Sequence, residues 1–479
     1  MKLLLFIKIL TIQGTLFIIL PKFFGGTLSP ATTRQLSREE FTRLLQHAST
    51  QDDFVHVGTV GEGPGRGTWQ GFSCSASETR VLHPGDADNK ELVRLAGEME
   101  AEDRNYPGYS ADTNCLVGGW IGFLSYELGY IREPRLAPIC PTLPVPLFSA
   151  GLYLWMASHN RKTGDYYLWI HPECPENQVD QIAEWLARPD GDEPCSWKIT
   201  ESFKPRQSPE SFKTGVQTIQ DYIQAGDCYQ ANLSQEFVGK FSGDPWFAFQ
   251  ALAEANPTPY SAFIRAGEYS ILSIFPERFL EIEGRTVKTS PIKGTRPRGK
   301  TPEEDAALAA ELQASPKDRA ENLMIVDLLR NDLGLNAATG SVSVDQLFAL
   351  ESYRNVHHLV SHIRAELADG VSPLTALFDA FPGGSITGAP RIRAMEIIRE
   401  LEPHWRGPYC GSMFYYGLDG RLDSNIAIRT LLCDGEGTIR CWGGGGIVAD
   451  SDPEGEYQET LAKVGSLMGF LEELETGPG

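Results

Sequence analysis

The sequence has few basic residues for its length. Its 479 residues include 42 Lys and Arg against 63 Asp and Glu, which gives a formal net charge of −21. A chain this acidic does not attract nucleic acid phosphates over a broad surface, so a general nucleic-acid-binding role is excluded. A local basic pocket for an anionic small molecule is compatible with this charge.

Paired cysteine motifs are also missing. The nine cysteines are scattered along the chain, none lies in a C-x-x-C pair, and no Cys/His cluster has the spacing of a zinc site. An odd number of cysteines in a long chain favours reduced thiols over a disulfide framework. We therefore expect a cytoplasmic protein.

The apolar stretch near the N-terminus is too short to span a membrane. It runs without charge from Ile9 to Pro21, a stretch of 13 residues, and a bilayer needs roughly 20. It resembles the hydrophobic part of a signal peptide, but no A-x-A cleavage site follows it. We expect residues 1–26 to be a dispensable apolar N-terminal extension; the alternative is an export or anchoring signal.

Repeats and low-complexity tracts are absent, and 41% of the residues are hydrophobic, which is enough for a packed globular core. A polar, proline-containing junction at 204–209 separates an N-terminal region over 27–205 from a second domain over 206–474. In the second domain helices alternate with short strands, which indicates a mixed α and β fold. The predicted helices there are 211–225, 305–312, 319–333, 390–401 and 453–474.

Two of these helices carry acidic pairs. The helix that begins after Ser315 has Asp318 and Glu321 on one face, with Asp318 at the N3 position of a capping box. The helix that begins after Ser451 or Asp452 carries three charged residues at i, i+3 and i+7: Glu456, Glu459 and Lys463. One interpretation is helix capping and solvated charge. The other is that the two acidic pairs meet around one divalent ion, since Mg²⁺ prefers a few carboxylates together with water and ligand oxygens.

Two glycine-rich segments and two basic residues are further candidates for substrate binding or catalysis. Residues 443–446 are four consecutive glycines, and alone they predict a tight turn whose N–H groups can approach an anion. Residues 381–390 predict a glycine turn that leads into a helix. Lys293 follows a short apolar strand, which indicates a fixed position and, if buried, a nucleophile or base. Arg429 is predicted inside an apolar strand, where it needs an anionic partner such as a substrate carboxylate.

Taken together, these segments resemble the chorismate-utilising enzymes. The resemblance covers residues 208–470 almost continuously, extends into 118–129, and is faint before residue 110. The motifs that carry it are GGWIGFLSYELG (118–129), GDCYQANLSQEF (226–237), FPERFL (275–280), SPIKGTRPRG (290–299), DRAENLMIVDLLRNDLG (318–334), NVHHLVS (355–361), FPGGSITGAPRIRAMEII (381–398), YCGSMFYY (409–416), LDSNIAIRTL (422–431) and GGGGIVADSDPEGEYQET (443–460).

The resemblance implies an α+β fold like that of anthranilate synthase component I, with two β-sheets packed as a sandwich and surrounded by helices. Two positions distinguish its branches. Gln230 stands where relatives that add water to chorismate carry a lysine base, and Lys293 stands where anthranilate-forming relatives carry alanine. Lys293 resembles the branch that aminates chorismate at C4 for p-aminobenzoate and folate synthesis; the alternative is an anthranilate synthase component I.

By the same resemblance, Glu277 and Lys293 are the catalytic residues. Glu277 is implied as the general acid that protonates the departing C4 hydroxyl, a role that suits a carboxyl of raised pKa in a closed site. Lys293 is implied to attack C2 as a neutral amine, after which ammonia adds at C4 and the lysine is expelled. Covalent catalysis divides one difficult displacement into two easier steps.

The resemblance also implies a metal site and a substrate pocket. Glu321 and Glu459 are the implied direct Mg²⁺ ligands, with Asp318 and Glu456 acting through water. The family usually has glutamate at position 318, and Phe275 replaces the serine usual before Pro-Glu. The residues implied to contact chorismate are Gln230, Gly294, Thr295, His358, Ser385, Tyr409, Arg429, Gly444, Gly446 and Lys463.

A partner is implied as well. None of the cysteines lies in the G-x-C-x-G context of a glutamine amidotransferase nucleophile, so the resemblance implies a heterodimer with a separate amidotransferase subunit that supplies ammonia. We expect neither a nucleic acid partner nor membrane contact. The competing class is a catalytically idle relative that acts as a binding subunit; the presence of Glu277, Lys293, Glu321 and Glu459 argues against it.

Overall fold

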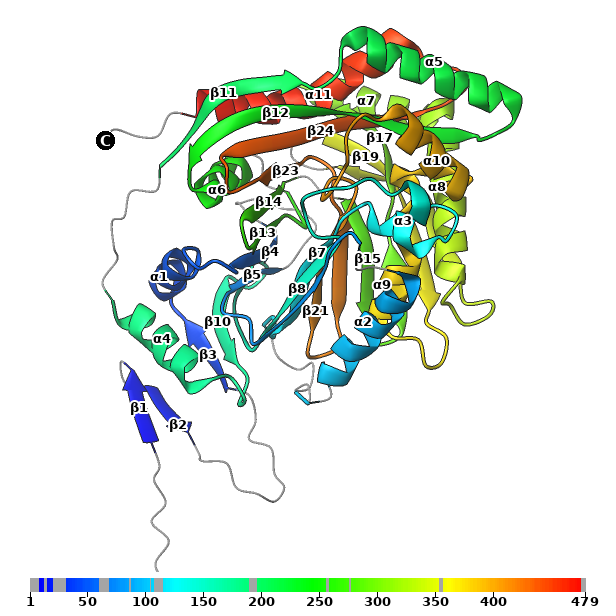
Figure 1. Cartoon of the computed structure of the whole chain (residues 1–479). Helices are drawn as coiled ribbons and strands as arrows, with labels where there is room; N and C mark the ends of the chain where they lie inside the picture. The colour runs from blue at the N-terminus through cyan, green and yellow to red at the C-terminus, as the bar shows by residue number, and fades with distance from the viewer. Residues whose placement is uncertain are drawn as a thin grey trace, which may run out of the picture.

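Two large antiparallel β-sheets form the centre of the molecule, and helices cover their outer faces (Figure 1). The computed structural model describes residues 8–12, 15–19, 32–59, 69–85, 88–103, 105–106, 115–188, 196–255, 258–274, 277–352 and 356–474. This arrangement confirms the predicted α+β class and the two packed sheets.

The first sheet has twelve strands in the described part of the chain. Its strand order is β11 (Trp197–Pro205), β12 (Gln230–Gly243), β24 (Thr438–Ile447), β23 (Thr430–Cys433), β14 (Tyr269–Ser273), β13 (Ala262–Ala266), β4 (Val55–Gly58), β5 (Trp69–Ser73), β9 (Trp155–Asn160), β10 (Asp165–Ile170) and β3 (Thr32–Leu36), with β20 (Gly388–Ala389) paired to β12.

The second sheet has ten strands over the same described ranges. Its order is β17 (Ile292–Pro297), β19 (Val356–Glu366), β16 (Thr286–Thr289), β15 (Glu277–Glu283), β22 (Leu422–Ile426), β21 (Ser412–Gly417), β7 (Gly119–Leu124), β8 (Phe148–Tyr153) and β6 (Glu78–Leu82), with β18 (Ser343–Ser352) paired to β19.

Both sheets draw strands from both parts of the chain. In the first sheet β13 pairs with β4, and in the second β21 pairs with β7 over six residues, from Ser412 opposite Leu124 to Gly417 opposite Gly119. The larger apolar core cluster of the described residues spans both regions, and fully buried side chains such as Trp120, Trp155 and Trp442 belong to it. A second, smaller cluster lies around Phe212 and Ile397. Regions 27–205 and 206–474 are therefore built into the same two sheets.

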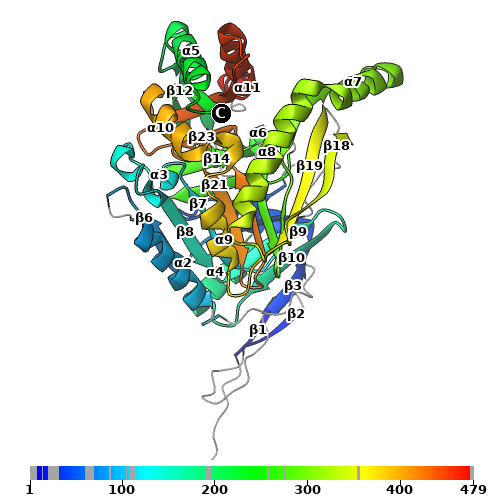
Figure 2. The same cartoon turned by 90° about the vertical axis from the view of Figure 1, so that its right-hand side faces the viewer.

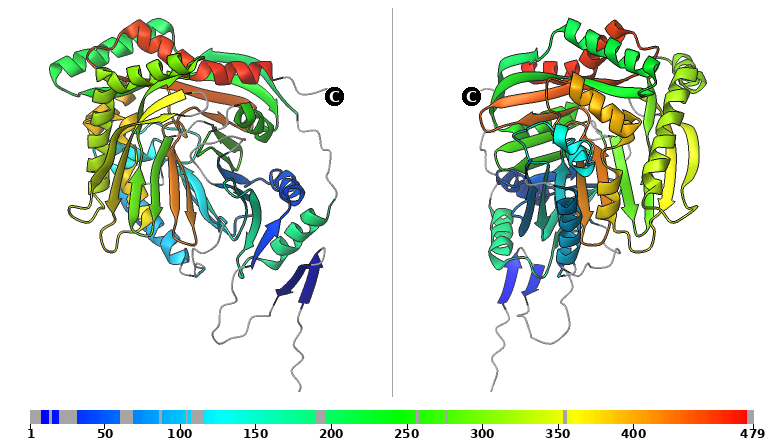
Figure 3. Two further views of the ribbon diagram at one scale, coloured as in Figure 1. Left: turned by 180° about the vertical axis from the view of Figure 1, so that it is seen from behind. Right: turned by 45° about the vertical axis from the view of Figure 1, so that its right-hand side comes forward.

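The helices lie outside the sheets. Figure 1 and Figure 2 show α5 and α11 side by side across β12 and β24, while α8 follows β19 along the second sheet. The views in Figure 3 show α2 and α9 together on the same side of the molecule as α8. The bounds are α1 (Arg38–Ala48), α2 (Asn89–Asp103), α3 (Leu128–Arg132), α4 (Glu176–Ala187), α5 (Pro209–Ala225), α6 (Pro245–Ala255), α7 (Pro302–Ala314), α8 (Pro316–Gly334), α9 (Pro373–Ala380), α10 (Arg391–Leu401) and α11 (Pro453–Glu473), with 3₁₀ turns η1 (Ala137–Ile139) and η2 (Gly384–Ile386).

The starts of the two acidic helices agree with their predicted caps in part. The Ser315 side chain accepts the backbone N–H of Asp318, and Asp452, not Ser451, caps α11 by accepting the N–H of Gly455 at 2.7 Å. The capping box at Ser315 is half formed, because the Asp318 carboxylate binds the Arg296 guanidinium at 3.2 Å instead of reaching back to the cap.

The four-glycine segment corrects a prediction. Residues 443–446 form no turn; they lie inside β24, where Gly444 is opposite Ser234 and Gly446 is opposite Asn232 of β12. Glycine disfavours a strand on its own, so pairing with β12 decides the conformation here. The missing side chains leave the backbone of this strand open to close approach.

Of the N-terminal extension, the structure describes two short strands, β1 (Lys8–Ile12) and β2 (Thr15–Ile19), which pair antiparallel. Among the described helices, none combines the length and apolar character needed to cross a bilayer.

Candidate active site

A backbone contact ties the two predicted catalytic residues together. Glu277 is the first residue of β15, and its Oε1 accepts the backbone N–H of Ile292 at 2.6 Å. Ile292 immediately precedes Lys293 in β17, and both Glu277 and Lys293 are half-buried. The carboxyl group is thus held against the strand that carries the lysine.

The residues that follow Lys293 lie between α8 and β19. Gly294 has φ of +84°, and a Cβ there would lie 3.0 Å from the Cγ of Asp318, so this position requires glycine. Thr295 is opposite His358 in the β17–β19 pair, and its Oγ1 lies 2.9 Å from His358 Nδ1. β17 therefore brings Lys293, Gly294 and Thr295 against the start of α8.

The acidic pairs of α8 and α11 influence each other across the site. Burial raises the pKa of Glu321, and the neighbouring Asp318 and Glu459 carboxylates raise it further, although Lys293 opposes them. Burial also raises the pKa of Glu456. Burial acts in the same direction on Glu459, but the Lys463 ammonium outweighs it, so the net pKa of Glu459 is lowered. Half-buried like charges facing one another favour a bound cation.

The donor set fits Mg²⁺. A Cβ on Gly445 would lie 3.2 Å from Glu456 Oε2 and 3.8 Å from Glu459 Oε1, so the bare glycine strand leaves room beside both carboxylates. Over the described ranges no three metal-ligating side chains are clustered as a ready-made site. Mg²⁺ suits such a set because it takes one or two protein carboxylates and fills its other positions with water and ligand oxygens.

Some of these carboxylates already have partners in the chain. Glu456 Oε1 accepts the Ser451 hydroxyl at 2.7 Å, and Glu459 Oε1 lies 2.6 Å from Lys463 Nζ. Asp318 is paired with Arg296. Glu321 has no hydrogen bond or ion pair within the described residues, which makes it the carboxylate most available to a metal.

The glycine strand also lies against Gln230 and Tyr409. A Cβ on Gly446 would lie 2.5 Å from Gln230 Nε2, and a Cβ on Gly444 would lie 2.8 Å from the Tyr409 hydroxyl. Lys463 Nζ donates to the Gly444 carbonyl at 2.9 Å. Burial raises the pKa of Tyr409 well above its usual value, so its phenol stays protonated and can donate to an anion.

Arg429 lies elsewhere than predicted. It is not inside a strand: it stands between β22 and β23 with φ of +48°, where the chain passes from the second sheet to the first. Burial lowers the pKa of its guanidinium, so an anionic ligand would stabilise the charged form. The Ser385 hydroxyl, in η2, is buried with no hydrogen-bond partner in the described structure, as expected of a group that awaits a ligand.

Sequence reasoning missed several supporting groups. The Ile292 N–H that holds Glu277 carries no sequence signal, because it is a backbone atom. Lys317 acts electrostatically on Glu321 and Glu459, and its place one residue before Asp318 was the only sign of this. Phe275, the noted departure from the family pattern, lies outside the described residues.

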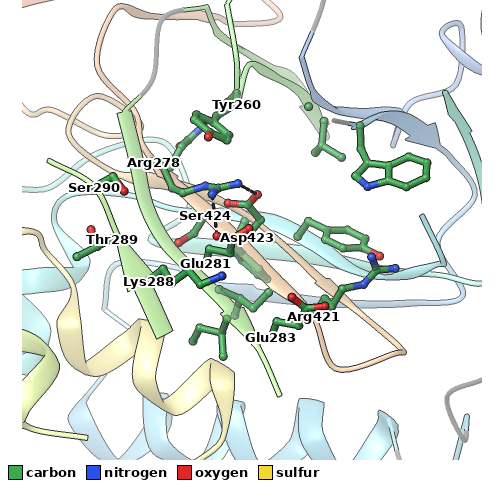
Figure 4. Close-up of a pocket in the computed structure, with 18 of the residues that line it drawn as sticks. Tyr260, Arg278, Glu281, Glu283, Lys288, Thr289, Ser290, Arg421, Asp423 and Ser424 are labelled. Carbon is green, nitrogen blue, oxygen red and sulfur yellow. Dashed lines mark hydrogen bonds and ion pairs between the residues drawn. The ribbon is translucent and has the colours of Figure 1, made fainter. Parts of the chain in front are cut away.

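A separate cavity of about 720 Å³ lies between the two sheets, and none of the predicted site residues lines it (Figure 4). Figure 4 shows Arg278 pointing into it, where its guanidinium lies 3.0 Å from Asp423 and stacks 4.4 Å from the Tyr260 ring centre. Side chains alternate along a strand, so Arg278 and its neighbour Glu277 face opposite sides of β15.

Comparison with known proteins gives consistent matches. Residues 62–469 match the chorismate binding enzyme family. The chain is 43% identical to aminodeoxychorismate synthase component 1 of Klebsiella aerogenes, over 74% of this chain and 78% of that protein. It is 44% identical to anthranilate synthase component 1 1 of Haloarcula marismortui, over 88% of this chain and 87% of that protein. The crystal structure of anthranilate synthase component I from Streptococcus pneumoniae superposes with a TM-score of 0.72 at 29% identity, covering 85% of this chain and 94% of that one.

Proposed function

This chain belongs to the chorismate binding enzyme family, and we propose that it converts chorismate and ammonia into 4-amino-4-deoxychorismate, as an aminodeoxychorismate synthase component I. One observation carries the proposal. Lys293 follows directly on the backbone group that holds Glu277, and its charge acts on both Glu321 and Glu459. A nucleophile, an acid and two carboxylates thereby share one site.

The residues support a two-stage displacement. Once its ammonium has given a proton to solvent, the neutral Lys293 amine attacks C2 of chorismate, the two conjugated ring double bonds shift, and the C4–O bond breaks while Glu277 delivers a proton to the departing hydroxyl, which leaves as water. The Glu277 carboxylate then takes back one proton from the Lys293 nitrogen, which becomes a secondary amine. Ammonia then bonds to C4, the two double bonds shift back, and the C2–N bond breaks as a proton passes from the ammonia nitrogen to Lys293.

Binding of the dianionic substrate rests on local positive and donor groups, since the chain as a whole is acidic. Tyr409, Arg429 and the backbone of Gly444 and Gly446 would hold the enolpyruvyl carboxylate. Ser385, in η2, would lie beside the ring carboxylate and donate its hydroxyl there. Glu321 and Glu459, with Asp318 and Glu456 acting through water, would hold Mg²⁺, which supplies charge that binds and polarises the ring carboxylate.

The source of ammonia is a partner subunit in this proposal. Relatives named component 1 belong to enzymes with a second component, and we infer that a glutamine amidotransferase fills that role here. We further infer a cytoplasmic location, since the eight described cysteines are all free thiols and seven of them are buried.

Product identification tests the proposal. The purified chain is incubated with chorismate, Mg²⁺ and ammonium at mildly alkaline pH, and the products are resolved by mass spectrometry. We expect the analogue of chorismate in which an amino group replaces the C4 hydroxyl. Fluorescent anthranilate would instead establish the alternative function, that of an anthranilate synthase component I, which is the name of the Haloarcula marismortui relative. No turnover with either ammonium or an added amidotransferase would identify an idle relative.

A further inference from the structure

A buried arginine connects three walls of the proposed pocket. The Arg406 side chain is 1% exposed. Its Nη1 donates to the Ile386 carbonyl at 3.0 Å, and its Nη2 donates to the Asn232 carbonyl at 3.1 Å. The face of its guanidinium lies 4.4 Å from the centre of the Tyr126 ring. One planar group is thus fixed by elements far apart in the sequence.

Glu402 completes the arrangement. Its two carboxylate oxygens accept Nε and Nη2 of Arg406 at 2.9 and 2.7 Å, a bidentate pair in which both side chains are buried. The same carboxylate accepts the backbone N–H and the hydroxyl of Ser234, each at 2.7 Å. Each guanidinium nitrogen of Arg406 and each carboxylate oxygen of Glu402 has a hydrogen-bond partner, which is the condition under which a buried ion pair is stable.

A second carboxylate fixes the backbone of the arginine. Glu127, 1% exposed and carried by the segment between β7 and α3, accepts the N–H groups of Arg406 at 2.7 Å and of Gly407 at 2.9 Å. The segment from 406 onward leads to Tyr409. The N-terminal region therefore holds one end of a loop whose other end reaches the pocket.

Each contact lies next to a residue of the pocket. Ile386 follows Ser385, Asn232 is two residues beyond Gln230, and Ser234 is opposite Gly444 in the β12–β24 pair. Arg406 itself is three residues before Tyr409. The backbone carbonyl of Arg406 accepts the Tyr409 N–H at 3.1 Å, and its buried side chain acts on the proposed pocket through the other neighbours.

We propose that Arg406, paired with Glu402, is a positioning residue that sets the spacing between the Ser385 turn, the β12–β24 glycine wall and Tyr409, and thereby the affinity for chorismate. The inference rests on the proposed function. A lysine cannot replace the arginine, because its single ammonium cannot reach Glu402, Ile386 and Asn232 in one plane. Displacement of one wall by about 1 Å is enough to reduce activity strongly.

The test compares Arg406→Lys with Arg440→Lys. Arg440 also pairs with a fully buried carboxylate of β12, that of Glu236 at 3.5 Å. Its other side-chain partners in the described structure are Asp434 and the Trp405 ring, and neither is a residue of the proposed pocket. With ammonium as the nitrogen source, we expect Arg406→Lys to raise the KM for chorismate about tenfold and to leave the KM for ammonium unchanged. Arg440→Lys should change neither KM. Equal KM values for chorismate in both variants, with only the melting temperature lowered, would overturn the proposal.

A smaller substitution keeps the test decisive if Arg406→Lys does not fold. Ser234→Ala removes one hydroxyl that donates to Glu402 and leaves the ion pair in place. We expect the KM for chorismate to rise about fivefold, which is the size of effect expected from the loss of one hydrogen bond. An unchanged KM would refute the positioning role. A wild-type product other than the C4 amine would refute the proposed function alone, since the KM comparison needs only a reaction that consumes chorismate.

Discussion

The carboxylate of Glu277 accepts the backbone N–H of Ile292 at 2.6 Å, and the next residue in that strand is Lys293. The proposed acid and nucleophile are therefore placed by one hydrogen bond between β15 and β17. A shift of either strand would separate them, so their relative position depends on the sheet and not on the two side chains alone.

Glu277→Gln separates positioning from proton delivery. The amide oxygen can still accept the Ile292 N–H, but the side chain has no acidic proton to give to the departing hydroxyl. We expect kcat to fall about 100-fold or more while the KM for chorismate stays close to that of the wild type. Glu283→Gln, at the exposed end of the same strand, is the matched control, and an equal kcat in both variants would contradict the role of Glu277.

Lys293→Ala removes the nucleophile. We expect formation of the C4 amine to fall about 1,000-fold or more, as for loss of other covalent nucleophiles, with chorismate binding retained in calorimetry. The exposed Lys300 provides the control, since Lys300→Ala should leave the rate unchanged. If the Lys293→Ala variant instead formed the C4 amine at the wild-type rate, the covalent route would be wrong.

Removal of Mg²⁺ with a chelator should abolish turnover, and added Mg²⁺ should restore it. Glu321→Gln should raise the Mg²⁺ concentration needed for half-maximal binding at least about tenfold, measured by calorimetry in the presence of chorismate. Glu454→Gln alters an exposed residue of the first turn of α11 that is paired with Lys213, and it should have no effect. A Mg²⁺ affinity that is identical in the three proteins would exclude the site between α8 and α11.

Gly446→Ala tests the glycine wall. A Cβ at this position would lie 2.5 Å from Gln230 Nε2, so Gln230 must move and the pocket must narrow. We expect the KM for chorismate to rise about tenfold. In Gly465→Ala, where the new Cβ meets nothing within 4 Å in the middle of α11, we expect normal kinetics and a gain of about 0.5–1 kcal/mol in the free energy of unfolding. Normal binding by Gly446→Ala would show that chorismate lies elsewhere.

Glu127 gives the protein a pH-dependent stability. Burial raises its pKa from 4.5 to about 7, so the folded state holds a proton that the unfolded state releases near pH 4.5. Stability from this group is therefore full below pH 4.5 and is lost as the pH rises toward 7. Relative to Glu127→Gln, the wild type should lose about 3 kcal/mol of unfolding free energy between pH 4.5 and 8. Parallel stability curves for the two proteins in chemical denaturation would contradict this.

The sequence was most informative where one segment decides its own structure. The helices at 316–334 and 453–473 begin at the predicted caps, since a serine or aspartate followed by proline acts within one turn. The prediction of a turn at residues 443–446 was wrong because glycine alone favours a turn. Only the pairing with β12, which lies far earlier in the chain, makes these residues a strand. The prediction that Arg429 lies inside a strand was wrong because its positive φ is set where the chain crosses from one sheet to the other.

The site shows the same division. Resemblance placed Glu277, Lys293 and the acidic residues of α8 and α11 in one pocket, since their motifs are local. The groups that support them come from distant parts of the chain. Arg406 donates its backbone N–H to Glu127, 279 positions away, and its side chain donates to Asn232 of β12, 174 positions away. A single sequence contains no pattern that links such positions.

The position of β24 has a consequence for how the protein is made. This strand joins β12 to β23 and so connects two blocks of the first sheet, yet it follows every other described strand in the chain. During synthesis on the ribosome, the edges of β12 and β23 that pair with β24 stay unpaired until residues 438–447 emerge. Such late, long-range closure is slow and exposes strand edges to other chains. Early binding by a chaperone to the nascent chain would shield these edges, and release of a chain that ends before residue 438 should lead to aggregation.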